Sequence, residues 1–131
     1  MKKTGILNRY ISIVLSKLGH TDTIIIADCG LPIPDDTICI DVSLHLGEPP
    51  LWKVLEELME HIVVEKITMA TEMKTNNLNL HDEIITTYSD IEMDYMSHDE
   101  LKACIKNTKA VIRTGEATPY ANVILQAGVI F

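Results

Sequence analysis

The apolar run "TIIIAD", residues 23–28, limits the folds open to this chain more than any other segment. A strand with one solvated face alternates apolar and polar residues, whereas a run without alternation is typical of a strand buried on both faces. Gly30, Pro32 and Pro34 follow the run and predict its end. Because a strand buried on both faces needs helices above and below its sheet, the run favours an α/β protein.

Helical and extended patterns alternate along the rest of the chain. Apolar residues at helical spacing predict four helices: one ending near Gly19, one after Pro50, one from about Asn79 and one from Ser97. Apolar runs predict five more strands, at residues 37–43, 63–72, 90–96, 110–115 and 122–131. This alternation predicts one three-layer α/β/α domain over residues 1–131, with a mostly parallel, mixed sheet of about six strands. The short last connections allow an antiparallel strand at the edge of the sheet.

The composition excludes several classes of partner. The 131 residues suffice for one domain with a single core. The net charge of −8 offers no basic stripe to a phosphate backbone, so we expect no nucleic-acid partner. No apolar run approaches the roughly eighteen residues of a membrane span, so we expect a soluble protein with no membrane partner. Three cysteines without C-x-x-C spacing favour a reducing compartment, and the cytoplasm is the default.

Polar side chains stand at the ends of the predicted strands. Ligands of such sheets bind beyond the carboxyl ends of the strands, where Asp28 closes the first strand and residues 119–122 form the loop before the last. His20 enters the first strand from the other end, unless the turn before it folds back. Structural alternatives stay open: turn preferences alone favour a structural role for Asp28 and Asn122, and capping preferences favour a solvated first-turn position for His98. For His20 the structural and functional interpretations are balanced.

The sequence contains none of the usual motifs for cofactors or metals. It has no G-x-G-x-x-G, P-loop or G-x-S-x-G motif. His45, His61 and His81 lack metal-ligand spacing, so we assign no metal. The polar candidates are Asp, Asn, Tyr and His side chains without an arginine cluster. These groups hydrogen-bond neutral hydroxyls, as a sugar requires.

Three longer segments carry a resemblance to a known family. "GHTDTIIIADCGLPIP" near the N-terminus, "MSHDELK" late in the chain and "RTGEATPYANVILQAGVIF" at the end closely resemble the family of ribose pyranases and fucose mutarotases. The similarity extends over essentially the whole chain, although residues 48–94 contribute little to it.

The resemblance implies an isomerase that interconverts the β-pyranose and β-furanose forms of D-ribose, supplying the form that ribokinase phosphorylates, without a cofactor. His20 of "GHTD" would be the catalytic acid/base. The sugar-binding residues would be Asp28, His98, Tyr120, Ala121 and Asn122. On this interpretation both polar flanks of the first strand, His20 and Asp28, face the sugar. Lys102, one helical turn after His98, could reach the same site.

The resemblance also implies an assembly, a homodecamer of two stacked pentamers. Independently, the apolar segment "VILQAGVIF" would be an aggregation risk if it formed a bare edge strand, so we expect a closed homo-oligomer with sites near subunit contacts. Three alternatives stay open at this stage: a fucose mutarotase, a non-catalytic sugar-binding component of ribose uptake, and a structural ring subunit.

Overall fold

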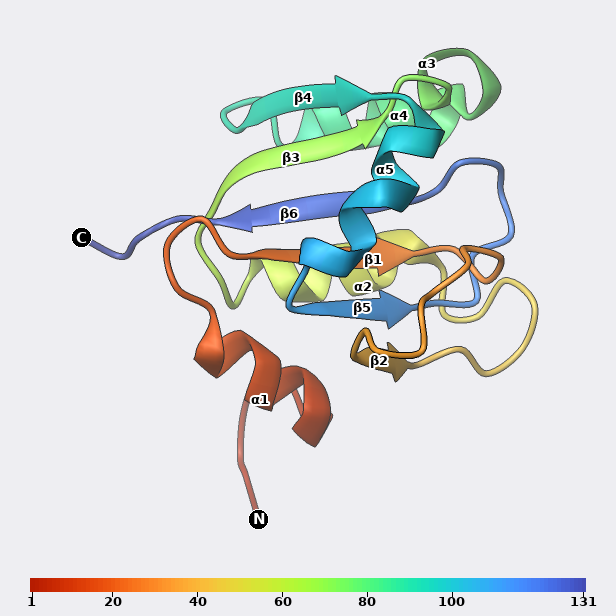
Figure 1. The fold of residues 1–131 in the computed structure, drawn as a ribbon. Helices are drawn as coiled ribbons and strands as arrows, with labels where there is room; N and C mark the ends of the chain where they lie inside the picture. Colours follow the sequence, from red (N-terminus) through yellow and green to blue (C-terminus); the bar gives the residue numbers. More distant parts are fainter.

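The computed structural model describes residues 1–131 as a mixed sheet between two layers of helices (Figure 1). The helices are α1 (Arg9–Lys17), α2 (Leu51–Met59), α3 (Met73–Asn76), α4 (Leu78–Thr87) and α5 (His98–Cys104), followed by a short 3-10 helix, η1 (Ile105–Asn107). The strands are β1 (Thr23–Ala27), β2 (Cys39–Asp41), β3 (Val64–Ala70), β4 (Glu92–Met96), β5 (Ala110–Arg113) and β6 (Val123–Ala127). None of the helices combines the length and the hydrophobicity needed to cross a membrane.

The sheet has six strands in the order β2-β5-β1-β6-β3-β4. β6 is antiparallel to both of its neighbours, β1 and β3, and the other pairs are parallel. The sheet is mixed, as predicted, but its antiparallel strand lies in the middle and not at the edge. Residues 114–122 connect β5 to β6 without a helix that could return the chain to the opposite end of the sheet. β6 therefore starts where β5 ends and runs in the reverse direction.

Two apolar cores of unequal size lie on the two faces of the sheet. The larger core receives side chains from α1, α2 and α4, and the smaller receives them from α5 and η1. Ile24 and Ile26 of β1 point into the larger core and Ile25 into the smaller, and all three are 0% exposed. The three-layer architecture and the burial of β1 on both faces are confirmed.

Side-chain caps set the starts of two helices. Asn8 Oδ1 accepts hydrogen bonds from the backbone N–H groups of Tyr10 and Ile11, both at 3.0 Å, at the start of α1. Ser97 Oγ accepts one from Glu100 N at 3.1 Å at the start of α5. Both are the N-cap bonds that such side chains provide. The predicted Ser97 cap is confirmed, and it fixes His98 as the first residue of α5.

The structure corrects several predicted bounds. β2 has only three residues because it pairs with β5 alone, at the edge of the sheet. α3 and η1 were not predicted. The predicted last strand ends at Ala127, and the tail beyond it leaves Ile130 and Phe131 exposed. The exposed apolar surface at the C-terminus is therefore this tail and not an edge strand.

Candidate functional site

A cavity of about 410 Å³ opens at the carboxyl ends of the parallel strands. Its lining comes from the segment after β1, the loop before β6 and the first residue of α5: Asp28, Cys29, Gly30, Leu31, His98, Glu116, Ala117, Thr118, Pro119 and Tyr120. In Figure 1 this is the end of the sheet toward which β1, β3, β4 and β5 all point. The structure thus brings together three of the predicted site residues, Asp28, His98 and Tyr120.

Asp28 is held by two reciprocal hydrogen bonds to Asn122. Asn122 Oδ1 accepts from Asp28 N, and Asn122 Nδ2 donates to Asp28 Oδ2, both at 3.0 Å. The other carboxylate oxygen accepts from Gly30 N at 2.9 Å. Asn122 and Ala121 are 0% exposed and neither side chain lines the cavity. The amide of Asn122 therefore acts on the cavity through Asp28, whose orientation it fixes.

His98 and Tyr120 form an aromatic corner of the cavity. Their rings meet edge to face, with centroids 5.2 Å apart. The backbone N–H of His98 donates to both carboxylate oxygens of Glu72, at 3.0 and 3.1 Å. His98 Nδ1 is buried and has no hydrogen-bond partner, and buried polar atoms in proteins are nearly always paired. This imidazole therefore has unused hydrogen-bonding capacity beside the cavity.

Backbone strain coincides with both segments that carry the predicted site residues. Only two non-glycine residues have a positive φ: Tyr120, at 56°, and Thr21, beside His20, at 71°. The conformation is uncommon for any residue with a Cβ and costs most for a β-branched one such as threonine. Such strain persists only where the surrounding structure maintains it, and strained residues cluster at functional sites.

Two residues of the cavity were missed from the sequence. Glu116 lines it, and its Oε1 accepts a hydrogen bond from Leu51 N, at the start of α2, at 3.2 Å. Thr118 lines it and accepts a hydrogen bond from the side chain of Asn77 at 2.9 Å. The loop "RTGEATPYAN" contains both, but no motif distinguishes them. Lys102 is not in the lining, and its Nζ pairs with Asp99 at 3.1 Å.

His20 precedes β1 (Thr23–Ala27), whereas the cavity lies beyond the other end of this strand, at Asp28. The five residues of β1 alone span roughly 16 Å at about 3.3 Å per residue. Asp22 N donates to Gly19 O at 3.1 Å, and Gly19 N donates to Asp22 Oδ2 at 2.8 Å, so the intervening turn is closed. The turn does not fold back toward the cavity. Within one chain, His20 and Asp28 are therefore too far apart to contact the same sugar, and the prediction that both face it stays open for two different chains.

The side chain of His20 has one protein partner. Its Nε2 lies 3.0 Å from Glu65 Oε2, and the His20 side chain is 54% exposed. Glu65 belongs to β3, far from His20 in the sequence. An exposed imidazole held by a carboxylate can exchange protons with a molecule from outside its own subunit.

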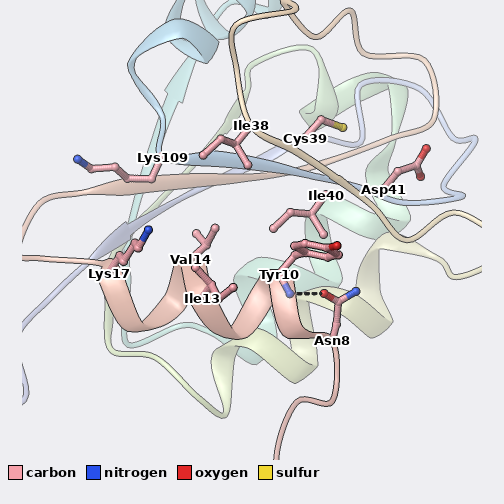
Figure 2. A pocket seen from close by; sticks show the side chains of 10 residues that line it. All are labelled: Asn8, Tyr10, Ile13, Val14, Lys17, Ile38, Cys39, Ile40, Asp41 and Lys109. Atoms are coloured by element: carbon pink, nitrogen blue, oxygen red, sulfur yellow. Dashed lines mark hydrogen bonds between the residues drawn. The ribbon is translucent and has the colours of Figure 1, made fainter.

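A larger apolar groove lies between α1 and β2 (Figure 2). Its volume is about 600 Å³, and Tyr10, Ile13 and Ile38 in its walls are 63%, 48% and 59% exposed. Its walls are mainly apolar, with Asn8, Lys17, Asp41 and Lys109 as the polar side chains, whereas a sugar site concentrates its donors and acceptors around the ligand. We therefore assign the small-molecule site to the cavity that contains Asp28 and not to this groove.

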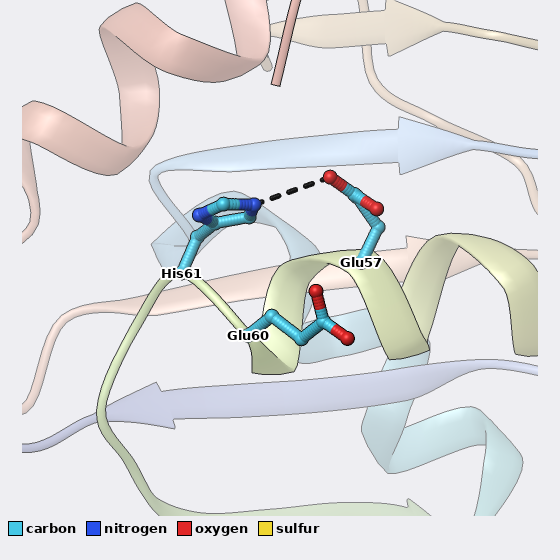
Figure 3. A group of neighbouring side chains, drawn as sticks. All are labelled: Glu57, Glu60 and His61. Carbon is cyan, nitrogen blue, oxygen red and sulfur yellow. Dashed lines mark hydrogen bonds and ion pairs between the residues drawn. The ribbon is translucent and has the colours of Figure 1, made fainter. Parts of the chain in front are cut away.

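His61 lies beside two acidic side chains at the end of α2. The spacing of the histidines in the sequence did not predict this group. Figure 3 shows Glu57, Glu60 and His61, whose ligand atoms all lie within 4.8 Å of one another. His61 Nε2 lies 3.2 Å from Glu57 Oε1, an i,i+4 pair on the helix surface. The group is exposed, and such pairs are common on helices without an ion.

The Asn122 hydrogen bonds lead to a prediction about stability. Asn122→Ala removes an acceptor from Asp28 N and a donor from the carboxylate, so we expect it to lower the free energy of unfolding by about 2–4 kcal/mol. Asn107→Ala, at an exposed residue, is the matched control and should stay within about 0.5 kcal/mol. Urea denaturation measures both, and equal stabilities for the two variants would contradict the assigned role of Asn122.

Comparisons with known proteins agree over the whole chain. Residues 1–130 match the model of the RbsD / FucU transport protein family. A D-ribose pyranase of Bacillus cytotoxicus is 53% identical and one of Staphylococcus haemolyticus 54% identical, each over 100% of both chains.

Solved structures agree with these relatives. The structure of Bacillus subtilis RbsD complexed with D-ribose matches with a TM-score of 0.97 at 50% identity, over 100% of both chains. The fucose mutarotase of Streptococcus pneumoniae, in complex with L-fucose, matches with a TM-score of 0.75 at 19% identity, over 95% of each chain, which shows a shared fold alone. With a family model over nearly its full length and relatives above 50% identity, this chain belongs to the RbsD/FucU family.

Proposed function

We propose that this protein is a D-ribose pyranase, an isomerase that interconverts the pyranose and furanose forms of D-ribose. The observation that carries the proposal is the full-length match, at 50% identity, to a structure complexed with D-ribose. The cavity at the carboxyl end of the sheet supports it independently. A carboxylate, an imidazole and a phenol converge there without an arginine, as suits a neutral polyol.

The cavity residues bind and orient the sugar. Asp28 accepts hydrogen bonds from hydroxyl groups, because an ionised carboxylate has lone pairs beyond those used by Gly30 and Asn122. His98 can hydrogen-bond a further hydroxyl, and the ring of Tyr120 provides an apolar wall.

His20 supplies the acid/base chemistry. The pyranose opens when the anomeric hydroxyl loses a proton and the ring oxygen gains one, which breaks the bond between the ring oxygen and the anomeric carbon. The free aldehyde then rotates, and a different hydroxyl attacks it to close the furanose. One imidazole can accept and return the proton near neutral pH.

The position of His20 requires the second half of the site to come from another copy of the chain. Since β1 separates His20 from Asp28 within one subunit, a sugar in the cavity can meet His20 only if a neighbour presents it. The exposure of the His20 side chain supports this arrangement. Each contact between two copies would then complete one site.

The protein is accordingly a closed homo-oligomer in this proposal, and the family resemblance implies a decamer of two stacked pentamers. β6 gives no support as a bare edge strand, because it lies inside the sheet. The support comes from the exposed apolar surfaces of the groove in Figure 2 and of the tail residues Ile130 and Phe131. Surfaces of this kind commonly mark contacts between proteins.

The cellular location that fits this function is the cytoplasm, where a ribokinase would use the product. All three cysteines, Cys29, Cys39 and Cys104, are free thiols, as is usual in a reducing compartment.

Saturation-transfer NMR on D-ribose tests the proposed activity. A pyranase transfers magnetisation between the pyranose and furanose signals faster than the uncatalysed sugar does, whereas a non-catalytic binding component only broadens the lines. The same experiment on L-fucose tests the alternative of a fucose mutarotase. Acceleration with fucose but not with ribose would replace the proposal by that alternative.

The activity is expected to survive chelation. Proton transfer by an imidazole needs no Lewis acid, so dialysis against EDTA should leave the ribose exchange rate unchanged. The exposed group Glu57, Glu60 and His61 is the one place where an added metal could bind. Loss of exchange after dialysis, restored by zinc or magnesium, would show that the proposed chemistry is incomplete.

A further inference from the structure

We propose that Glu65 is a positioning residue for His20: it holds the imidazole by Nε2–H and leaves Nδ1 free to exchange protons with the sugar. The inference rests on the proposed function, in which His20 is the acid/base group. It deepens that function by naming the reacting nitrogen and the residue that selects it.

The hydrogen bond itself defines the tautomer. His20 Nε2 lies 3.0 Å from Glu65 Oε2. An ionised carboxylate can only accept a hydrogen bond, so Nε2 must carry the proton. In the neutral imidazole the lone pair then resides on Nδ1, which is the atom that can take a proton from a hydroxyl.

A β-bulge directs Glu65 toward His20. In the pairing of β3 with β6, Val64 is opposite Ala127 and Lys66 is opposite Gln126, so Glu65 is an extra residue without its own partner. Bulges of this kind turn a side chain out of the regular alternation of a strand. The displaced carboxylate reaches both Gln126 and His20.

Gln126 fixes the other end of the carboxylate. Its Nε2 donates to Glu65 Oε1 at 2.6 Å. Gln126 lies in the central strand β6, between Thr23 of β1 and Lys66 of β3, so its backbone is held on both sides. Glu65 is therefore anchored by one oxygen and offers the other to His20.

The turn that carries His20 is equally constrained. Thr21, the residue after His20, has a positive φ of 71°. Its backbone N–H donates a hydrogen bond to Ala127 O at 2.9 Å, which ties the turn to the end of β6. The side chain of Asp22 closes the turn on Gly19. A strained backbone at a β-branched residue is consistent with a turn that holds the His20 side chain in one position for function.

Hydrogen bonds to its carboxylate keep Glu65 ionised. The hydrogen bond from Gln126, followed by that from His20, lowers the pKa of the Glu65 carboxyl below its ordinary value of 4.5. Among the charged groups near the pair, Lys66 also lies 4.0 Å from Asp94, and Asp22 pairs with Lys109 at 3.6 Å. Glu65 is thus an acceptor over the whole neutral pH range, and this support is lost only as the pH falls through its lowered pKa.

Glu65→Gln gives the decisive test because it reverses the hydrogen-bond polarity. The oxygen of the substituted side-chain amide would have to accept from Gln126, so the NH₂ group of that amide would face His20 and donate to Nε2. We expect the His20 proton to move to Nδ1, a change that two-bond ¹H–¹⁵N NMR of the imidazole detects at mildly alkaline pH. The His20 signal is assigned as the one absent from His20→Ala.

The same variant should lose activity without losing the sugar. We expect ribose exchange to slow about 10- to 100-fold, short of the roughly 10²- to 10⁴-fold that general acid/base catalysis contributes, with ribose affinity unchanged. Glu65→Asp, which keeps the charge, should recover part of the rate and the Nε2–H tautomer. Glu83→Gln, at an exposed position on α4, is the matched control and should behave as the wild type.

The outcomes separate this inference from the proposed function. A folded Glu65→Gln protein that keeps the Nε2–H tautomer, or that changes tautomer and exchanges ribose at the wild-type rate, would overturn the role of Glu65. A wild-type protein without ribose exchange would overturn the proposed function itself. The tautomer of His20 would still report whether Glu65 holds the imidazole.

Discussion

Replacing His20 with alanine is expected to slow the exchange of ribose between its pyranose and furanose forms by about 10²-fold or more. The imidazole is the group that takes the proton from the anomeric hydroxyl and returns it to the ring oxygen. Ribose binding should weaken much less, because Asp28, His98 and Tyr120 form the cavity at the other end of the sheet. Saturation-transfer NMR measures the exchange, and a ribose titration measures the affinity.

Asp28→Asn is the comparison variant, and it should have the opposite profile. Both oxygens of Asp28 accept hydrogen bonds, from Gly30 N and Asn122 Nδ2, so the new NH₂ group must oppose one donor. We expect ribose affinity to fall about 10- to 100-fold, the equivalent of about 1.5–3 kcal/mol for a hydrogen bond to a charged group.

A folded His20→Ala protein that exchanges ribose at the wild-type rate would refute the mechanism.

The fold was largely predictable because local patterns carry it. Ile24, Ile25 and Ile26 are uninterrupted in the sequence because both faces of β1 are covered, and all three are 0% exposed. Ser97 and Glu100 stand at capping-box spacing, and the cap bond forms. Periodicity and capping are properties of neighbouring residues, so one sequence suffices to predict them.

The order of the strands was not predictable from the same patterns. An apolar segment such as β6 fits either an edge position or a central position in a sheet. Its insertion between β1 and β3 depends on contacts between segments that are distant in the sequence. The expected bare edge strand was wrong for this reason. The exposed apolar tail, Ile130 and Phe131, is a different feature.

The candidate site was predictable in part. Asp28, His98 and Tyr120 do line one cavity, and the rule that ligands bind at the carboxyl ends of strands predicted Asp28 and residues 119–122. Glu65 was missed because a bulge, and not the strand pattern, directs its side chain. Two adjacent charged residues, Glu65 and Lys66, inside an otherwise apolar strand were the one available signal.

The position of His20 could not be deduced from the order of residues. The sequence sets His20 and Asp28 on the two flanks of one strand, and a strand holds its flanks apart. Whether they act on one sugar depends on how copies of the chain pack, which no local pattern describes. The pairing of His20 with Asp28 at one sugar therefore depends on the assembly.

Mixing the two impaired variants, His20→Ala and Asp28→Asn, is expected to restore activity at subsaturating ribose. A His20→Ala subunit keeps an intact cavity, and an Asp28→Asn subunit keeps an intact imidazole. If the imidazole comes from a neighbour, then random assembly of equal amounts should make about a quarter of the sites complete, since each site needs one subunit of each kind in the correct order. Sedimentation velocity verifies that every preparation is the same closed homo-oligomer.

The preparation needs real exchange of subunits between the two variants. Co-expression, or joint refolding from denaturant, provides it, and simple mixing of assembled oligomers is the control. His20→Ala refolded alone and Asp28→Asn refolded alone give the baselines. The double variant His20→Ala/Asp28→Asn, assembled alone, gives the rate of a site that lacks both groups.

The most direct test of the shared site is thus the ribose exchange rate of the mixed oligomer at subsaturating ribose. A site shared between two subunits predicts about a quarter of the wild-type rate, above the rate of either variant assembled alone. A mixed oligomer with no more activity than the two variants assembled separately would contradict it, because each site would then draw His20 and Asp28 from the same chain.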